Sequence, residues 1–218
     1  MSRFPNRAEA GRRLAEKLDE YAGRDDVVVL ALPRGGVAVG FEVAKALRAP
    51  LDVYLVRKLG VPGHEELAMG AIASGGVRVL NREVLRATGI PNQAVERVAA
   101  REQQELQRRE QAYRGDRPPP QLEQRAAILV DDGLATGATM RAAVGAVRQQ
   151  HPAAIVVATP TGSRSACAAL EDSVDGCVCL ITPEPFYGVG AWYEEFPQLT
   201  DEEVRDLLRR AQEELPAQ

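Results

Sequence analysis

Residues 126–139 read AAILVDDGLATGAT, and this stretch is the most informative about the fold. Its first five residues are apolar, a run of the length expected for a buried strand. Two adjacent carboxylates, Asp131 and Asp132, follow the run, and a loop of small residues leads into a helical pattern over residues 139–149. A strand that ends in polar residues and a small-residue loop before a helix is typical of parallel α/β sheets, in which ligands bind at the carboxyl ends of the strands.

The same alternation of strands and helices continues on both sides of this stretch. Each expected strand is a short apolar run, and the expected helices have apolar residues at intervals of three or four. This alternation favours a mostly parallel sheet with helices on both faces, a three-layer, Rossmann-like α/β fold. The expected strands cover residues 27–32, 51–56, 126–131, 153–159 and 177–181, and the expected helices cover residues 6–21, 37–47, 91–113, 139–149, 163–170 and 200–208.

Two segments depart from the alternation. Residues 60–81 contain a short apolar–polar alternation, a Ser-Gly-Gly turn and a second alternation, which predicts a flexible loop with a hairpin inserted into the fold. Residues 182–218 combine aromatic and glycine residues with a final helix, and we expect a small C-terminal hood or cap. No linker-like composition divides the chain, so residues 1–218 are expected to form a single domain.

Composition excludes several functional classes. The net charge of -4 gives no general attraction for a nucleic acid, and no apolar run reaches the length of a membrane span. The polar N-terminus lacks the apolar core of a signal peptide, and we expect a cytoplasmic protein that does not bind membranes. The two histidines and three cysteines have no metal-ligand spacing, so the cysteines are expected to be buried thiols.

The loop at residues 131–139 has the chemistry of a sugar phosphate site. Carboxylates accept hydrogen bonds from hydroxyl groups, and Asp131 and Asp132 together suit a vicinal diol. The small residues beyond them allow backbone N–H groups and the start of a helix to surround a phosphate, with Thr136 and Thr139 as further donors. A ribose 5-phosphate has both parts.

This loop resembles the signature of the type I phosphoribosyltransferases. Members bind 5-phosphoribosyl-1-pyrophosphate (PRPP) and transfer its ribosyl phosphate to a nitrogenous base with release of pyrophosphate. The resemblance implies that Asp131 and Asp132 bind the ribose hydroxyls. Gly133 departs from the family, which usually has an aliphatic residue there, and we expect a local change of backbone conformation at this position. The residues implied for the 5-phosphate are Ala135, Thr136, Gly137, Ala138 and Thr139.

Three further segments match the family in the expected order. Pro33-Arg34-Gly35-Gly36 resembles the pyrophosphate loop, in which a strained or cis peptide bond, here Arg34–Gly35, turns backbone amides toward the diphosphate. Arg57 and Lys58 match a basic pair aimed at the pyrophosphate, and the insertion that follows them takes the place of a loop that closes over the site. The pattern LPRGGV, VRKLG, ELAMGAIA and DDGLATGAT is most similar to a branch of predicted phosphoribosyltransferases whose acceptor is unassigned.

The resemblance also implies a mechanism and its cofactor. Mg²⁺ would be bound mainly through PRPP and pyrophosphate, since the sequence holds no dedicated set of metal ligands. Arg34 and Lys58 would act as catalytic groups on the leaving pyrophosphate, and Glu65 or Glu66 would assist the base, as in adenine-using members. An acceptor similar to a purine is favoured, although Ala135 replaces the Asp of enzymes that use 6-oxopurines.

The C-terminal aromatic residues suggest where the base binds. Tyr187 could stack on a planar base, and Val189 lies in a segment that resembles the base-binding segment of purine members. Trp192 and Phe196 are interpreted as packing residues of the cap.

Two other functions remain open from the sequence. The same fold serves in PRPP-sensing regulatory proteins. A basic face formed by four arginines of residues 91–113 would suit RNA, although the net negative charge of the chain counts against nucleic-acid binding. A hydrolase or ribosyl phosphate binder would use water in place of the base. The favoured interpretation is an enzyme of nucleotide salvage, compatible with a homodimer. The four arginines are Arg97, Arg101, Arg108 and Arg109.

Overall fold

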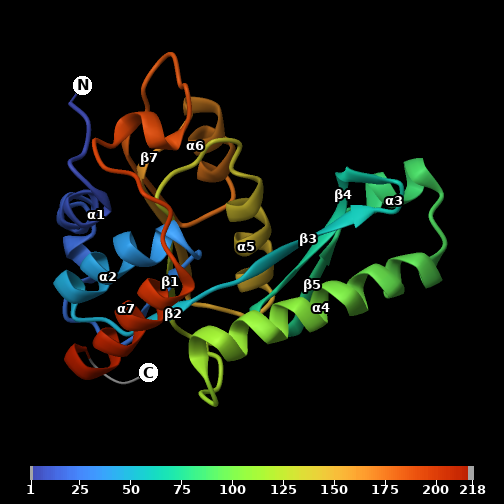
Figure 1. Cartoon of the computed structure of the whole chain (residues 1–218), viewed down its shortest axis with the longest axis horizontal. Helices are drawn as coiled ribbons and strands as arrows, with labels where there is room; N and C mark the ends of the chain where they lie inside the picture. The colour runs from blue at the N-terminus through green and yellow to red at the C-terminus, as the bar shows by residue number, and fades with distance from the viewer. Residues whose placement is uncertain (1, 216–218) are drawn as a thin grey trace.

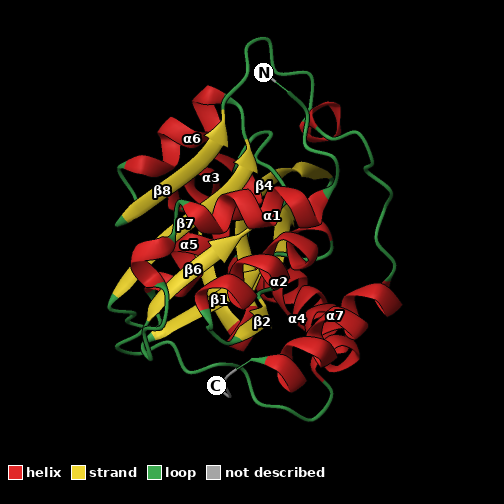
Figure 2. Cartoon of the chain, turned by 90° about the vertical axis from the view of Figure 1, so that its left-hand side faces the viewer, coloured by secondary structure: helices red, strands yellow, loops and turns green. Residues whose placement is uncertain are grey.

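The computed structural model describes residues 2–215, and its core is a sheet of five parallel strands (Figure 2). The expected α/β class is confirmed, because every pair of neighbouring strands in this sheet is parallel. The strands are β1 (Val27–Ala31), β2 (Leu51–Val53), β6 (Ala126–Val130), β7 (Ala154–Thr161) and β8 (Gly176–Ile181), in the spatial order β2-β1-β6-β7-β8.

Helices cover both faces of the sheet (Figures 1 and 2). On one face lie α1 (Arg7–Glu16) and α2 (Gly35–Leu47), with α7 (Asp201–Glu214) packed on α2; on the other lie α5 (Ala138–Arg148) and α6 (Arg164–Glu171). Successive side chains of a strand point to opposite faces. In β1, Val27, Val29 and Ala31 therefore belong to the first core, and Val28 and Leu30 belong to the second. Burial on both sides explains why these strands are continuous apolar runs.

The strand order creates a topological switch point between β1 and β6. From β1 the chain moves outward to β2 on one side, whereas from β6 it moves through β7 to β8 on the other. In such sheets the loops that leave the two strands at the switch point diverge and leave a crevice for a ligand. Here those loops are residues 32–34 after β1, which lead into α2 at Gly35, and residues 131–137 after β6.

A second unit projects from this body as an arm (Figure 1). It consists of an antiparallel sheet, β3 (Val56–Val61), β4 (His64–Ala73) and β5 (Val77–Leu80), with the 3₁₀ turn η2 (Ser74–Gly76) and the helices α3 (Arg82–Thr88) and α4 (Asn92–Arg114). Although α4 has 23 residues, no helix within residues 2–215 is both long and apolar enough to cross a membrane.

The structure of the arm differs from two expectations drawn from the sequence. The strand expected over residues 51–56 is divided, because β2 ends at Val53 and Val56 already begins β3 in the other sheet. The hairpin expected within residues 60–81 is present as β4 and β5, but its first part is a paired strand instead of a loop. The outer part of β4 is exposed on both faces, so its sequence lacks the alternation that marks a half-buried strand.

The N-terminal segment meets the segment that follows β8 near the carboxyl end of β6. The Phe4 N–H donates to the Trp192 carbonyl over 2.8 Å, and the Phe4 and Tyr193 rings pack against each other. Trp192 lies in the 3₁₀ turn η3 (Val189–Trp192), which belongs to the segment expected as a hood. The first helix is shorter than expected, since α1 ends at Glu16 and a 3₁₀ turn, η1 (Asp19–Tyr21), follows it.

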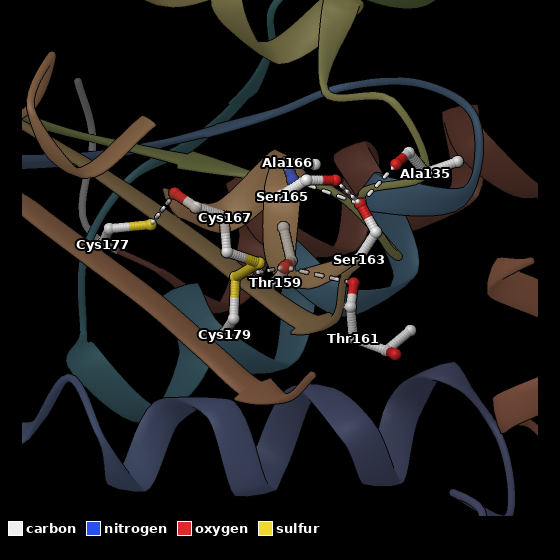
Figure 3. The surroundings of a disulfide bond; sticks show 9 residues. All are labelled: Ala135, Thr159, Thr161, Ser163, Ser165, Ala166, Cys167, Cys177 and Cys179. Atoms are coloured by element: carbon white, nitrogen blue, oxygen red, sulfur yellow. Dashed lines mark hydrogen bonds between the residues drawn. A yellow bond between two sulfur atoms is a disulfide. The ribbon is translucent and has the colours of Figure 1, made fainter. Parts of the chain in front are cut away.

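The cysteines are not all free thiols as expected. Cys167 of α6 and Cys179 of β8 form a disulfide, and Cys177 is free (Figure 3). Cys177 and Cys179 share one face of β8, as their spacing predicts, but that face packs against α6 and so brings a third cysteine within bonding distance. A contact between residues of two separate elements cannot be deduced from their spacing along the chain.

Candidate active site at the switch point

The Asp131–Asp132 pair lies directly after β6, at the crevice between the two diverging loops. The Asp131 Oδ1 accepts a hydrogen bond of 2.8 Å from the Asp132 N–H. Burial raises the pKa of both carboxyl groups, and the charge of Asp132 raises that of Asp131 further. Arg7 acts in the opposite direction on Asp132, since its guanidinium lies 2.8 Å from the Asp132 Oδ2 and lowers its pKa.

The loop after β1 approaches these carboxylates closely. A Cβ atom on Gly35 would lie 1.8 Å from the Asp132 Oδ2, and one on Gly36 would lie 2.7 Å from the Val130 carbonyl oxygen. Both positions therefore exclude a side chain. A cis peptide bond is present, but it joins Pro33 to Arg34, one residue before the expected Arg34–Gly35 bond. Gly35 is already the first residue of α2, so the loop makes its turn earlier than the sequence suggested.

The loop after β6 encloses a cavity of about 180 Å³. Gly137 has a positive φ of 69° and begins α5, so the loop residues before it curve around the start of that helix. The Arg141 Nη1 donates to the Thr136 carbonyl over 2.8 Å, and the Ser163 hydroxyl donates to the Ala135 carbonyl over 2.7 Å. These contacts fix a concave loop at a helix N-terminus, which is the geometry that binds phosphate. The cavity is lined by Asp131, by all residues from 133 to 140 and by Val189.

Gly133 is explained by its contact with the hood. Its φ is not among the positive values of the chain, so the expected change of backbone conformation is not a left-handed one. A Cβ atom at this position would instead lie 2.5 Å from the Val189 Cγ1. The Val189 side chain occupies the space that an aliphatic residue at 133 would fill, and the hood can pack directly on the loop.

This contact gives a testable prediction. We expect Gly133→Ala to destabilise the protein by about 1–3 kcal/mol, because the added methyl group overlaps Val189. The double variant Gly133→Ala/Val189→Ala should recover most of that loss, since the second change removes the overlapping atoms. Thermal unfolding of the three variants measures the coupling. Additive effects of the two substitutions would show that this contact does not set the packing of the hood.

The basic residues expected at the pyrophosphate have partners in the protein. Arg34 is the N-cap residue directly before α2, and its Nη1 lies 3.9 Å from the Asp201 Oδ1. Arg57 lies at the base of the arm and donates from Nε to the Glu102 Oε2 over 2.9 Å. Its neighbour Lys58 is exposed. The structure thus places Arg34 beside the glycine loop, whereas Arg57 faces α4.

The two glutamates considered for proton transfer lie far along the arm. Glu65 and Glu66 are at the start of β4, after the turn at the end of β3, and β3 and β4 extend away from the five-stranded sheet (Figure 1). The backbone N–H groups of Glu65 and Gly63 lower the pKa of the Glu65 carboxyl. A carboxyl group that acts as a general acid or base at neutral pH needs a raised pKa, so the lowered pKa of Glu65 does not favour this role.

The C-terminal aromatic residues divide into two groups. Tyr187 is 81% exposed and makes no ring contact within residues 2–215. Phe196 packs on Tyr193, with ring centroids 4.9 Å apart, and lies under the Arg7 guanidinium. The interpretation of Phe196 as a packing residue is therefore confirmed.

Two residues at the site were not recognised from the sequence. Arg7 is separated from Asp132 by 125 residues and contacts its carboxylate directly. Tyr193 donates from its hydroxyl to the Asp132 carbonyl over 2.7 Å. Neither residue stands in a motif, and only the packing of the N-terminal segment and the segment after β8 near the end of β6 brings them to the site.

The site offers few protein ligands for a cation, so a bound substrate would have to help hold a Mg²⁺ ion. Within residues 2–215, no three His, Cys, Asp or Glu side chains are grouped as metal ligands. The carboxylates of the site are adjacent, and one of them already contacts Arg7. Oxygen atoms of a bound diphosphate and ribose, together with water, would therefore have to supply the coordination of a Mg²⁺ ion, as is common for this metal.

Comparisons with known proteins agree with this geometry. Residues 2–191 match the family described as "Phosphoribosyl transferase domain". Two Mycobacterium tuberculosis proteins, both named "Putative phosphoribosyl transferase", are 48% identical over 211 residues, or 97% of this chain and 47% of theirs. The chain thus spans about half the length of these curated relatives.

Solved structures show the same fold. The protein TT1426 from Thermus thermophilus is 44% identical, with a TM-score of 0.86 over 95% of this chain and 98% of its own. A Neisseria gonorrhoeae protein with bound ppGpp is 14% identical, has a TM-score of 0.51 over 94% of this chain and 92% of its own, and shares the fold alone. The family match over residues 2–191 shows that the chain belongs to the phosphoribosyltransferase family.

Proposed function

We propose that this protein transfers the ribosyl phosphate of PRPP to a nitrogenous base and releases pyrophosphate. The observation that carries the proposal is the meeting of two loops at the β1–β6 switch point. The β6 loop offers adjacent carboxylates and a cavity at the start of α5, and the β1 loop brings Gly35 and Gly36 against those carboxylates. One ligand with a diol, a phosphate and a second anionic group matches this arrangement.

In the proposed complex each part of PRPP has its own residues. Asp131 and Asp132 accept hydrogen bonds from the ribose hydroxyls. The backbone and hydroxyl donors of the cavity, from Ala135 through Thr136, Gly137 and Ala138 to Thr139, bind the 5-phosphate. The backbone of Gly35 and Gly36 and the side chain of Arg34 bind the pyrophosphate. Glycine at both positions allows the ligand to approach the backbone.

The chemical step breaks the bond between C1 of the ribose and the pyrophosphate oxygen. Positive charge develops on the ribose ring and negative charge on the leaving group, so preorganised cations near the pyrophosphate lower the barrier. Arg34 lies in the glycine loop itself and supplies one such cation, and Arg57 and Lys58 join it if the arm moves toward the site. Bound Mg²⁺ would supply further positive charge to the diphosphate.

The acceptor is proposed to be a purine-like base held under the hood. Val189 already lines the cavity, and the exposed Tyr187, two residues before it, is placed to stack on a base. Proton transfer by Glu65 or Glu66 requires the arm to fold over the site on ligand binding. The reaction belongs to nucleotide salvage, and we propose a cytoplasmic setting for it.

Release of pyrophosphate tests the proposal. The protein is mixed with PRPP, Mg²⁺ and each member of a panel of purine and pyrimidine bases, and pyrophosphate is measured over time. We expect release that depends on one class of base and that falls by at least about 100-fold in Asp132→Asn, since a charged hydrogen-bond acceptor is lost at the ribose. Release that is independent of any base would indicate a hydrolase. PRPP binding without release, together with salt-sensitive RNA binding, would indicate the regulatory alternative.

A further inference from the structure

Arg7 is buried beside the candidate ribose site although it belongs to the N-terminal helix. Its side chain is 9% exposed, and that of Asp132 is 16% exposed. The Arg7 Nε donates to the Asp132 Oδ2 over 2.8 Å, and its Nη1 donates to the Pro197 carbonyl over 2.7 Å. The same guanidinium lies 3.8 Å from the centroid of the Phe196 ring. One side chain thus joins the β6 loop to the C-terminal segment.

The position of Arg7 in its helix does not explain its presence. Arg7 is the first residue of α1, and a cation in the first turn of a helix faces the positive end of the helix dipole. Burial of the guanidinium adds a further cost. The Asp132 carboxylate compensates for both effects. The buried guanidinium is therefore stabilised by its contact with Asp132 and not by its place in the helix.

The carboxylates need such a partner. Asp131 and Asp132 are adjacent and largely buried, and two negative charges in this environment repel each other. A carboxylate accepts hydrogen bonds from hydroxyl groups at both oxygens only when it is ionised. Among residues 2–215, the charged or titratable groups that face Asp132 besides Asp131 are Arg7 from α1 and the Tyr193 hydroxyl, which donates to the Asp132 backbone carbonyl.

We propose that Arg7 is a positioning residue for the ribose site: it fixes the Asp132 carboxylate through Oδ2 and balances the negative charge of the pair. The role rests on the proposed binding of PRPP. Arg7 acts through Asp132, so it need not touch the ligand. Its contacts with Pro197 and Phe196 also make the position of this carboxylate depend on the C-terminal segment. Phe196 in turn packs on η3, where a Cβ atom on Gly190 would lie 2.9 Å from its ring.

The test compares the binding of PRPP to wild-type protein and to Arg7→Met, Arg7→Lys and Arg12→Ala between pH 6 and pH 9. Arg7→Met keeps the bulk of the side chain and removes the charge. Arg12→Ala removes an exposed arginine from the same helix and is the matched control. Calorimetry gives the dissociation constant at each pH, and thermal unfolding reports the stability of each variant.

We expect Arg7→Met to weaken PRPP binding about 10- to 100-fold at pH 7, the loss associated with one charge-assisted hydrogen bond. Arg7 lowers the pKa of Asp132, so its removal raises that pKa. The defect relative to wild type should therefore be largest at low pH and shrink as the pH rises and the carboxylate ionises. Arg7→Lys should restore the pH profile in part, and Arg12→Ala should behave as wild type.

The outcomes separate this role from the proposed function. Binding by Arg7→Met that equals wild type at every pH would overturn the role of Arg7 alone. A weakened affinity with the same ratio to wild type at every pH, accompanied by a lower unfolding temperature, would also overturn it, because it would indicate a purely structural contact. Failure of the wild-type protein to bind PRPP or ribose 5-phosphate would overturn the proposed function and the role of Arg7 with it.

Discussion

Gly35→Ala should weaken PRPP binding by about 10- to 100-fold, the effect expected when a methyl group is forced into a packed site at a cost of about 1–3 kcal/mol. The added Cβ would lie 1.8 Å from the Asp132 Oδ2 and 2.5 Å from its Cγ. The carboxylate cannot simply rotate away, because Arg7 contacts the same oxygen. Either the carboxylate or the start of α2 has to move, and both belong to the proposed site.

Calorimetry with PRPP and Mg²⁺ measures this effect, and Gly145→Ala is the matched control. Gly145 lies within α5, where an added Cβ would meet the nearest side chain at 3.6 Å, an ordinary contact. Since alanine also favours a helix, the control should bind PRPP as wild type does. Equal binding by Gly35→Ala and Gly145→Ala would contradict the close approach of the two loops.

Arg114→Met should destabilise the protein by about 3–5 kcal/mol, the usual cost of removing one partner of a buried ion pair. Arg114 and Asp52 have side chains that are 3% and 0% exposed, and the Arg114 Nε lies 2.9 Å from the Asp52 Oδ2. The Arg114 Nη2 also donates to the Val53 carbonyl. These contacts attach the end of α4, and with it the arm, to β2.

For a chain of this size that loss should lower the unfolding temperature by roughly 10 °C. Arg108→Ala is the control, because Arg108 is an exposed arginine of the same helix and pairs only with Glu105 among residues 2–215. Its removal should leave the unfolding temperature unchanged. An equal effect of the two substitutions would show that the buried pair does not hold the arm to the body.

The sequence predicted the parallel sheet well because its strands are buried on both faces. A run such as residues 126–130 is apolar without interruption, and the polar residues that follow it mark the carboxyl edge of the sheet. The β6 loop and the glycine loop were found for the same reason, since both directly follow such strands.

The arm and the contacts of the N-terminal segment are harder to predict from the sequence. The outer half of β4 is exposed on both sides and shows no alternation, so its sequence is typical of a loop. Arg7 and Tyr193 reach Asp132 only through tertiary packing, which short-range patterns do not record. Gly133 can be recognised from the sequence as unusual. Its reason, the Val189 side chain, lies 56 residues away in the first residue of η3.

Titration of PRPP with Mg²⁺ into the wild-type protein and into Asp131→Asn/Asp132→Asn tests the central claim most directly. The double variant keeps the shape of both side chains and removes their charge. We expect wild-type protein to bind PRPP and the double variant to bind it at least about 100-fold more weakly, because two charged acceptors are lost at the ribose. Equal binding by the two proteins would contradict the placement of the ribose at the switch point.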